Sequence, residues 1–399
     1  MKKNFLTIAI AAALLVPGIA SATENSSVDD TGPVLYGYAQ ITGSNQFGTH
    51  GPEGLIFGAH RIRLGVKGEA VPGVTYNFQY EWDGAYQTGL LNKTLGVTNV
   101  PGSSSGVQEA EINFGFIPAL QLEVGKFLVP VGMERTQFSG NDLWFIQRSM
   151  NQSLGANYNF GMAIHSPDVM GTGLYYKLGI FNNYSLDDHD AFSSENVAHT
   201  FGAGQSGLGM GPVGGVKSNG NGRYLFAGMV GYKLSPLLNV EISGARADAK
   251  QLGRLAASKS ITAWNVGARG GLMGLKYMAE YSADVSPRGV EGARKQDWYV
   301  ALAANLHQMT LTPDWLDLEP AVRFEKIRIV DNQNGIDATL ANTTIGLNYY
   351  VNPNNPHAAE VQLNYIVPTQ TAYWRNKSRF VPENGYIYNT LALQFQAGF

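Results

Sequence analysis

One long segment of the chain combines charges of both signs with large apolar side chains. Residues 125–135 read Gly-Lys-Phe-Leu-Val-Pro-Val-Gly-Met-Glu-Arg, and residues 142–149 read Asp-Leu-Trp-Phe-Ile-Gln-Arg-Ser. The guanidinium groups of Arg135 and Arg148 are planar, permanently charged donors of the kind that bind carboxylate and phosphate. Ordinary surface loops consist of small polar residues. The apolar residues here, Trp144–Ile146 above all, therefore indicate a loop anchored against an interior wall.

The chemistry that these residues offer is binding rather than catalysis. No nucleophile lies beside a general base in the sequence, although a catalytic triad need not be local. The seven histidines show no metal-ligand spacing. The chain has no cysteine, which excludes disulfides, thiolate metal sites and covalent c-type haem attachment. We therefore expect no cofactor and no metal site.

Two short motifs suggest other chemistry only weakly. Residues 202–207 match the GxGxxG dinucleotide fingerprint, but no strand-then-helix unit surrounds them. Asp187, Asp188 and Asp190 carry carboxylates that suit a divalent cation such as calcium. A solvated external loop explains the same charges more simply.

The elements that position these residues alternate between apolar and polar with a period of two, which is typical of strands with two different faces. The pattern is clearest over 61–67, 74–83, 298–306 and 391–399, and weakest over 223–233. Sixteen such segments lie near 34–44, 58–69, 74–84, 107–116, 119–128, 159–165, 172–183, 223–233, 238–249, 260–268, 274–284, 297–307, 316–327, 340–350, 357–367 and 386–399. An all-β fold is predicted.

The connectors between these segments alternate in length. Short ones lie at 70–73, 117–118, 235–237 and 352–356, and long ones at 85–106, 129–158, 184–222 and 368–385. Short turns on one side and long loops on the other are typical of a transmembrane antiparallel β-barrel of the outer membrane. Closure also leaves no strand edge unpaired in hydrocarbon. We predict a barrel of about 16 strands over residues 34–399, with the third loop, 129–158, folded inward to narrow the pore.

The residues at both ends of the chain are typical of a protein that is exported to the outer membrane. Lys2 and Lys3 precede a short apolar run and the small residues 20–22, so residues 1–22 are predicted to be a signal peptide and 23–33 a short leading segment. The run is too short to cross a bilayer as a helix. The terminal Phe399 resembles the signal by which outer-membrane barrels are recognised for assembly. No basic face stands out, so nucleic acid is not an expected partner.

Alternation also predicts which charges line the lumen. If the apolar set faces lipid, then Arg61 and Arg63 face inward on one strand, and Glu81 and Asp83 on the next. The short hairpin turn between these strands pairs Arg63 with Glu81 and Arg61 with Asp83. Such pairs either stiffen the wall as an ion-pair ladder or form basic and acidic strips that set the ion preference of a pore.

Lys126 departs from this pattern. Strict alternation after Leu122 and Val124 points it at lipid, which costs about 2–4 kcal/mol at mid-membrane. A bulge at Gly125 would turn Lys126 inward and Phe127 outward. We expect that bulge, with Lys126 in the lumen.

Several of these stretches resemble the phosphate-selective porin O and P family. They are Gly125-Lys126-Phe127, Pro130, Glu134-Arg135, Gln147-Arg148-Ser149, the run from His60 to Gly68, and Glu109-Ala110. The resemblance is clearest over residues 34–150. It implies a trimeric outer-membrane porin embedded in the lipid bilayer, which passes small hydrophilic solutes, anions such as phosphate included.

The resemblance also implies a constriction site. In the family an arginine pair on the second strand, an acidic residue on the fourth, and a lysine and an arginine on the third loop bind anions. The matching positions here are His60 and Arg61, Gln108 with Glu109 beside it, Arg135 and Arg148. Together with the residues predicted above, the expected constriction set is Arg61, Arg63, Gln108, Glu109, Lys126, Glu134, Arg135 and Arg148.

One family feature has no counterpart in this chain. Phosphate-conducting members carry an arginine ladder that leads to the constriction, whereas residues 201–221 here are glycine-rich with Lys217 as the one basic residue. Arg135 and Arg148 also lie near Glu134 and Asp142. The solute therefore stays open between phosphate, another anion, organic acids and little selectivity.

Two other classes of protein use a similar barrel. A sheath that houses an outer-membrane cytochrome would receive haem only from its partner, because this chain has no cysteine, and an inward loop would leave that partner little room. An outer-membrane lipase or protease would need a catalytic Ser, His or Asp set at the barrel rim, and none stands out.

Overall fold

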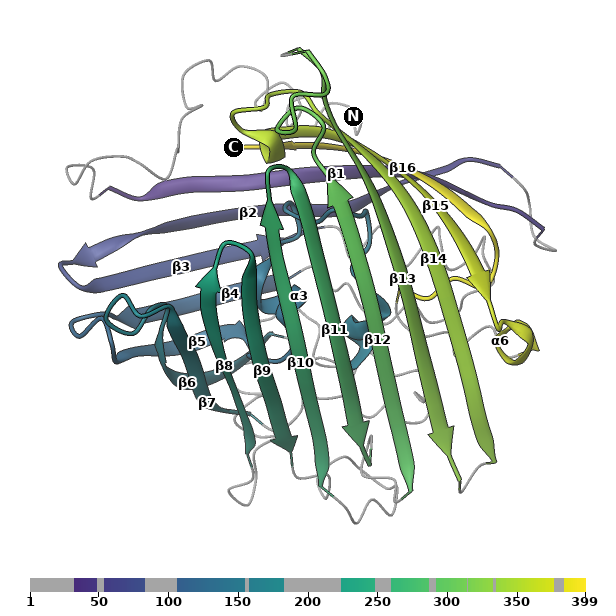
Figure 1. Cartoon of the computed structure of the whole chain (residues 1–399). Coiled ribbons are helices and arrows are strands. Elements are labelled where there is room, and N and C mark those ends of the chain that lie inside the picture. The colour runs from purple at the N-terminus through teal and green to yellow at the C-terminus, as the bar shows by residue number, and fades with distance from the viewer. Residues whose placement is uncertain are drawn as a thin grey trace, which may run out of the picture.

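The computed structural model describes residues 32–48, 54–82, 106–154, 158–182, 224–247, 260–286, 292–313, 315–332, 335–376 and 384–399. Antiparallel strands β1 to β16 form one closed barrel, in which every strand pairs with its sequence neighbours and β1 pairs with β16 (Figure 1). The predicted fold class is confirmed, including the number of strands. The predicted signal peptide, Asp83 and the motifs at 187–190 and 201–221 lie outside the described residues.

The strands are β1 (Val34–Gln46), β2 (Ile56–Val71), β3 (Val74–Glu81), β4 (Gly106–Phe114), β5 (Gln121–Leu128), β6 (Tyr158–Ser166), β7 (Leu174–Phe181), β8 (Leu225–Ser235), β9 (Leu238–Ala247), β10 (Ile261–Leu272), β11 (Leu275–Val285), β12 (Ala293–Ala304), β13 (Asp317–Asp331), β14 (Ile336–Tyr350), β15 (Ala359–Thr369) and β16 (Thr390–Gly398). The short helices are α3 (Met133–Gln137), η1 (Met150–Leu154), η4 (Pro356–Ala358) and α6 (Ala372–Asn376). No helix in the described ranges has the length and apolar character needed to cross a membrane.

Each of the sixteen predicted segments coincides with one strand. Three strands extend further toward the rim with the long loops than the pattern indicated: β12 begins at Ala293, β13 ends at Asp331 and β14 begins at Ile336. The outward positions in these extensions include Arg294 and Arg328. The apolar alternation is therefore lost there although the backbone pairing continues.

The seam between β1 and β16 closes the barrel. Tyr38 lies opposite Gly398, and backbone hydrogen bonds of 3.0 and 2.9 Å join Gly37 and Phe399 in both directions. The last residue of the chain is thus part of the wall. A closed wall leaves no strand edge that would need other partners.

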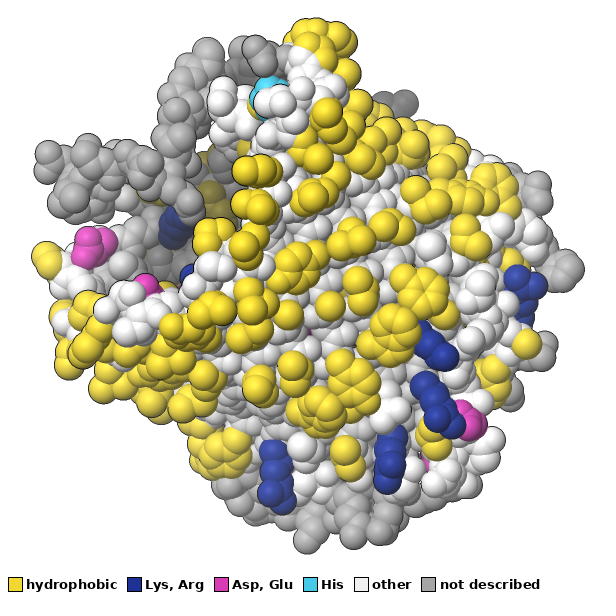
Figure 2. Space-filling model, viewed as in Figure 1, with side chains coloured by type: hydrophobic (Ala, Val, Ile, Leu, Met, Phe, Trp, Pro, Cys, Tyr) yellow, Lys and Arg dark blue, Asp and Glu magenta, His cyan; other side chains and the backbone are white. Residues whose placement is uncertain are grey.

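The outer face carries large apolar side chains in contact with the surroundings. Ile242 is 64%, Phe57 59% and Leu302 53% exposed, and Figure 2 shows such side chains as a broad band across the strands. On a soluble monomer this patch would far exceed the usual size. In a bilayer it is the lipid-facing surface that outer-membrane barrels require.

The bulge expected at Gly125 is absent. Strand β5 keeps an unbroken register with both neighbours, so Lys126 shares the outer face with Val124. Its Nζ donates to the carbonyl oxygen of Val107 at 2.5 Å, which offsets part of the cost of that position. Phe127 is 1% exposed and points inward. The prediction that Lys126 lines the lumen is therefore wrong.

Gly125 nevertheless matters for the pairing of β4 with β5. Its φ is 133°, and a Cβ would lie 2.1 Å from the carbonyl oxygen of Ala110. We expect Gly125→Ala to destabilise the barrel by about 2–3 kcal/mol, since strained backbone alone costs roughly 1–3 kcal/mol. Urea unfolding in detergent micelles, followed by tryptophan fluorescence, measures the change. The control is Gly58→Ala, where a Cβ meets nothing within 4 Å; equal stability of the two variants would contradict the assignment.

Candidate functional site

Residues 129–154 leave the end of β5 and run inside the barrel, as the position of α3 within the ring of strands shows (Figure 1). Helix α3 contacts β10, and η1 contacts β11, β12 and β13. Between these helices the chain crosses to β1 and β2 at residue 140 and then follows β14 and β15. The third loop therefore narrows the lumen, as predicted. We call residues 129–154 the constriction loop.

The first residues of the constriction loop pack against an apolar patch of the inner wall. Val129 is fully buried and Val131 is 2% exposed; together with Phe127 they pack against the inner wall. The wall residues of this cluster come from β6 to β10 and are Ala163, Phe181, Leu225, Ala227, Ala245 and Ala263. Four of the six are alanines, whose short side chains let the loop backbone approach the wall. Burial of apolar area then favours the inward path.

Glu280 of β11 receives the first turn of α3. Its carboxylate accepts hydrogen bonds from the backbone N–H groups of Met133 at 2.7 Å and Glu134 at 2.6 Å. The Tyr299 hydroxyl at 2.5 Å and the Asn265 amide at 2.7 Å also donate to it. The first N–H groups of a helix have no partner within the helix, and the Glu280 carboxyl group supplies two of those partners. Glu280 therefore fixes where α3 sits.

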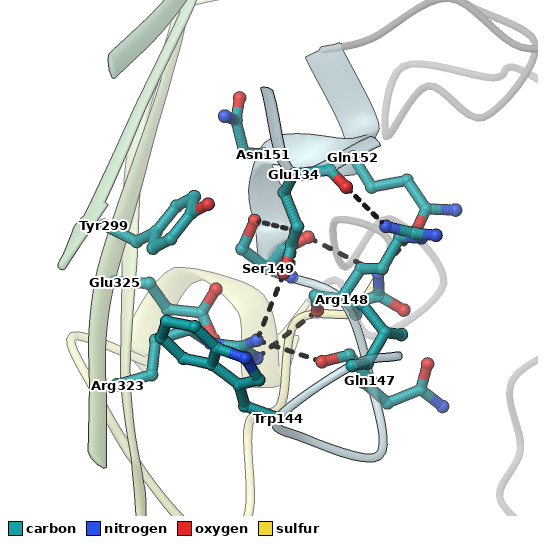
Figure 3. A network of polar contacts seen from close by, with 12 residues as sticks. Glu134, Trp144, Gln147, Arg148, Ser149, Asn151, Gln152, Tyr299, Arg323 and Glu325 are labelled. Atoms are coloured by element: carbon teal, nitrogen blue, oxygen red, sulfur yellow. Dashed lines mark hydrogen bonds and ion pairs between the residues drawn. The ribbon is translucent and has the colours of Figure 1, made fainter. Parts of the chain in front are cut away.

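Glu134 and Arg148 close the loop on itself (Figure 3). The Glu134 carboxylate accepts from the backbone N–H and the hydroxyl of Ser149 at 3.0 and 2.8 Å. The Arg148 guanidinium donates to the carbonyl oxygens of Glu134 at 2.8 Å and Phe138 at 2.6 Å. Both residues were predicted as pore-lining groups. Each is under 9% exposed, so their first role is to hold the loop's shape.

Arg323 and Glu325 of β13 hold the returning half of the loop (Figure 3). The Arg323 guanidinium donates to the carbonyl oxygens of Gln147 at 2.9 Å and Arg148 at 3.3 Å. It also forms a 3.1 Å ion pair with Glu325, whose other oxygen accepts from the Met150 N–H at 2.7 Å. One buried ion pair thus binds three successive parts of the loop backbone.

The loop comes closest to β1 and β2 at Gly140. The Gln40 amide donates to its carbonyl oxygen at 2.9 Å. A Cβ on Gly140 would lie 2.4 Å from the Tyr38 hydroxyl and 2.9 Å from Cδ of Arg61. A larger residue here would displace the Tyr38 or Arg61 side chain, and glycine places the loop tip directly beside Arg61.

Trp144, Phe145 and Ile146 anchor the loop to the wall, as expected from the sequence. The three are 8%, 4% and 2% exposed, and the first two pack with Met278, Tyr299, Ala301, Ala303 and Ala321. The Arg323 guanidinium lies 4.8 Å from the centre of the Phe145 ring, a cation–π distance.

Inward-facing amides of the last strands bind the backbone of this anchor. Asn348 donates to the carbonyl oxygen of Trp144 at 3.0 Å, and Gln362 to that of Leu143 at 2.8 Å. The Asn364 side chain accepts from the Ile146 N–H at 2.9 Å. Amides can serve both carbonyls and N–H groups without adding charge to the lumen.

A bulge in β2 places two adjacent residues in the lumen. Gln40 pairs with Arg61 and the next residue with Ala59, so His60 is the extra residue. Its ring nitrogens lie 2.9 Å from the Gln394 amide oxygen and 3.1 Å from that of Gln147. Because of the bulge, His60 and Arg61 both face inward although they are adjacent in the chain.

A second bulge does the same in β4. Gln79 pairs with Glu109 and Tyr80 with Val107, which leaves Gln108 as the extra residue. The Gln108 amide donates to the Glu81 carboxylate, and Glu109 accepts from Asn77 at 2.6 Å. Gln108 and Glu109 therefore both reach the lumen, and Glu109 supplies the carboxylate that Gln108 lacks.

The predicted charge ladder is present where the structure describes both partners. Arg63 lies opposite Glu81 and forms two hydrogen bonds with its carboxylate, at 3.1 and 3.2 Å. The predicted partner of Arg61, Asp83, lies outside the described residues. Arg135 is half-buried, with its guanidinium 5.7 Å from the centre of the Tyr158 ring.

An acidic strip faces the lumen on β4 and β5. It consists of Glu109, Glu111 and Glu123, and Lys177 of β7 forms a 2.5 Å ion pair with Glu123. Among the residues that the structure describes, no group of three or more His, Asp or Glu side chains could hold a metal ion. The lumen therefore carries charged groups of both signs, with Arg61 beside the loop tip.

A closed barrel with a lipid-type outer face and an inward loop in its lumen defines a pore-forming protein of the outer membrane. The sequence matches the family described as phosphate-selective porin O and P over residues 34–398. The chain belongs to this family and is an outer-membrane porin. A comparison with curated proteins gave no match.

Solved porin structures share the fold at low sequence identity. An anion-selective porin from Comamonas acidovorans has a TM-score of 0.57 and 11% identity, over 92% of this chain and 99% of that one. OmpF of Salmonella typhi, in a complex with daunomycin, has a TM-score of 0.58 and 14% identity, over 92% and 97%. OmpT of Vibrio cholerae, in its trimer form, has 0.52 and 11%, over 92% and 99%.

The residues that hold the loop were missed in the sequence. Glu280, Arg323 and Glu325 stand on inward positions of strands that were correctly predicted. The sequence did offer a signal on the lumen-facing positions of these strands. Met278-x-Glu280 and Ala321-x-Arg323-x-Glu325 place charged groups beside apolar or small residues. A wall that faces only water does not need apolar or small residues at such positions.

Removal of the Glu280 carboxylate tests the role of this contact. We expect Glu280→Ala to release α3 from the wall, because each buried N–H donor left without a partner costs roughly 1–3 kcal/mol. The single-channel conductance should then rise, or fluctuate between levels as the loop moves. The matched control is Glu319→Ala. Glu319 is equally buried, but its carboxylate binds Lys276 at 2.5 Å and Tyr350 at 3.1 Å, both on the wall. A steady wild-type conductance in Glu280→Ala would contradict the role.

Proposed function

We propose that this porin passes small hydrophilic anions, with phosphate among the candidates, and holds them only weakly. The proposal includes no reaction, since the family and the fold are those of a channel. The constriction loop crosses the lumen and meets the wall at β1 and β2, beside Arg61. The charges at that place decide which solutes pass.

The proposed anion preference rests on two arginines that no described carboxylate neutralises. The hydrogen-bond partners of the Arg148 guanidinium are two backbone carbonyls, and Arg61 donates to the Gln40 amide oxygen at 2.9 Å and contacts the His60 ring. Within the described part of the chain, neither guanidinium forms an ion pair with a carboxylate. Arg63 differs, because Glu81 neutralises it. Two positive charges beside the loop tip therefore keep their field.

The same geometry favours weak binding. Arg61 and Arg148 are 9% and 8% exposed, so each offers a passing anion only one edge of its guanidinium. Arg135, on the same loop, is more accessible than either of them. The acidic strip on β4 and β5 faces the same lumen and limits the net attraction. A channel must bind a solute weakly enough to release it.

We further propose that the protein is exported through the periplasm and assembles as a homotrimer. Residues 1–22 have the pattern of a signal peptide, and β16, which is followed by Phe399, closes the barrel against β1. The trimer rests on the family resemblance, and the OmpT structure named above is a trimer. Mass photometry of the protein in detergent measures the assembly directly.

Single channels in a planar bilayer with a KCl gradient test the anion preference. The proposal predicts a reversal potential shifted toward the equilibrium potential of chloride, and a reduced current when phosphate is added. A reversal potential shifted toward the equilibrium potential of potassium would overturn the proposal. Anion preference without any effect of phosphate would keep the anion porin and exclude phosphate as a bound solute.

Arg61→Gln should lower the chloride-to-potassium permeability ratio, because it removes an unneutralised charge while keeping a side chain that can hydrogen-bond. The matched control is the double variant Arg63→Gln/Glu81→Gln, which removes an existing ion pair and leaves the net charge unchanged. Its ratio should stay near that of the wild type. Equal shifts in both variants would show that Arg61 has no special role.

A further inference from the structure

A row of basic side chains lies on the outer wall, away from the pore. Arg294 of β12 and Lys326 and Arg328 of β13 occupy outward positions, in the same alternation as the apolar Val300 and Phe324. Figure 2 shows basic side chains gathered beside the apolar band, toward one rim of the barrel. The pore gives no reason for charges on this face.

The strand register brings these residues together. Lys326 lies opposite Trp298, Arg328 opposite Gln296, and Arg294 opposite Val330. Arg294 and Arg328 are therefore diagonal neighbours, a relation that spans roughly 7–8 Å, and Lys326 is two residues from Arg328 on the same face. Three long cationic side chains can thus reach one anionic group.

The row extends along the rim to β9. Arg246, exposed at the end of β9, pairs with Thr262, which pairs with Val285, which pairs with Arg294. Arg246 and Arg294 therefore lie on one line across four strands. We call Arg246, Arg294, Lys326 and Arg328 the basic row.

The basic row borders a girdle of aromatic side chains. The rings of Trp298 and Phe324 are 5.5 Å apart, and those of Trp264 and Tyr281 5.2 Å apart. Aromatic girdles mark the level where hydrocarbon meets the lipid headgroups. Lys326 lies level with Trp298, whereas Arg246, Arg294 and Arg328 are displaced from the girdle toward the long-loop end of the strands, which is the level of the outer-leaflet headgroups.

Little negative charge opposes the row. On the described outward positions of β9 to β14 the one acidic residue is Asp337, which forms bonds of 2.9 and 2.7 Å with Arg328. This pair is exposed and contributes little to stability. Arg294 and Lys326 form no ion pair with any described residue. The surface is therefore positive and complementary to anions.

We propose that the basic row binds the phosphate groups of lipids in the outer leaflet. The charge selects an anion, and the adjacent apolar band selects one that carries acyl chains, which inorganic phosphate lacks. The Lys326 stem lies along the aromatic girdle while its ammonium reaches the headgroup level, as long basic side chains do at interfaces. The site lies on the outside of the barrel and is independent of what the pore conducts.

The test uses the full barrel in detergent. Three probes are added separately: bisphosphorylated lipid A, dephosphorylated lipid A and inorganic phosphate. Native mass spectrometry counts the bound molecules. The wild type should bind the bisphosphorylated lipid most tightly. Arg294→Gln/Lys326→Gln should weaken that binding about 30-fold, since a surface cation near anionic lipid contributes roughly a fivefold factor. The Arg328–Asp337 pair stays intact in this variant.

Lys67→Gln/Lys233→Gln is the charge control, because it removes two exposed lysines from lumen-facing positions at the opposite end of the barrel and leaves the outer wall unchanged. It should bind lipid A as the wild type does. Equal affinity of the Arg294/Lys326 variant and the wild type would overturn the proposal, as would equal binding of the dephosphorylated lipid or of inorganic phosphate. Lys326→Gln alone, with an expected fivefold loss, serves if the double variant does not fold.

Discussion

A loop that enters a barrel must satisfy its backbone groups there, and this requirement shapes the whole lumen. Buried N–H and C=O groups without partners are costly. The wall meets the requirement with Glu280, with the Arg323–Glu325 pair, and with amides such as Gln362. The position of the constriction follows from which strands carry these side chains, so residues far from the pore axis control its width.

The family's anion-binding positions acquire different roles under this constraint. Arg148 donates its hydrogen bonds to the loop backbone, whereas Arg61 stays charged beside the loop tip. Arg63, which alternation and not the family placed in the lumen, is neutralised by Glu81. Arg148 also keeps its charge, because carbonyl oxygens do not neutralise it. One set of arginines can therefore both build the constriction and contribute to its potential.

The strands and the Arg63–Glu81 pair could be predicted because period-two alternation and a tight hairpin turn fix face and register together. The bulges at His60 and Gln108 could not, since one extra residue in a strand changes no composition. Lys126 was misplaced because the cost of a lipid-facing lysine was weighed without the Val107 carbonyl within its reach. Glu280 was missed because its partners lie 147 and 146 residues away in the sequence.

The most direct test of the account asks whether the constriction loop lies in the path of the current. The chain has no cysteine, so Ser139→Cys places a single thiol at an exposed position of the loop tip. Single channels of this variant are recorded in a planar bilayer while a bulky thiol reagent is added. The account predicts a stepwise loss of most of the current. An unchanged current in fully labelled protein would contradict it.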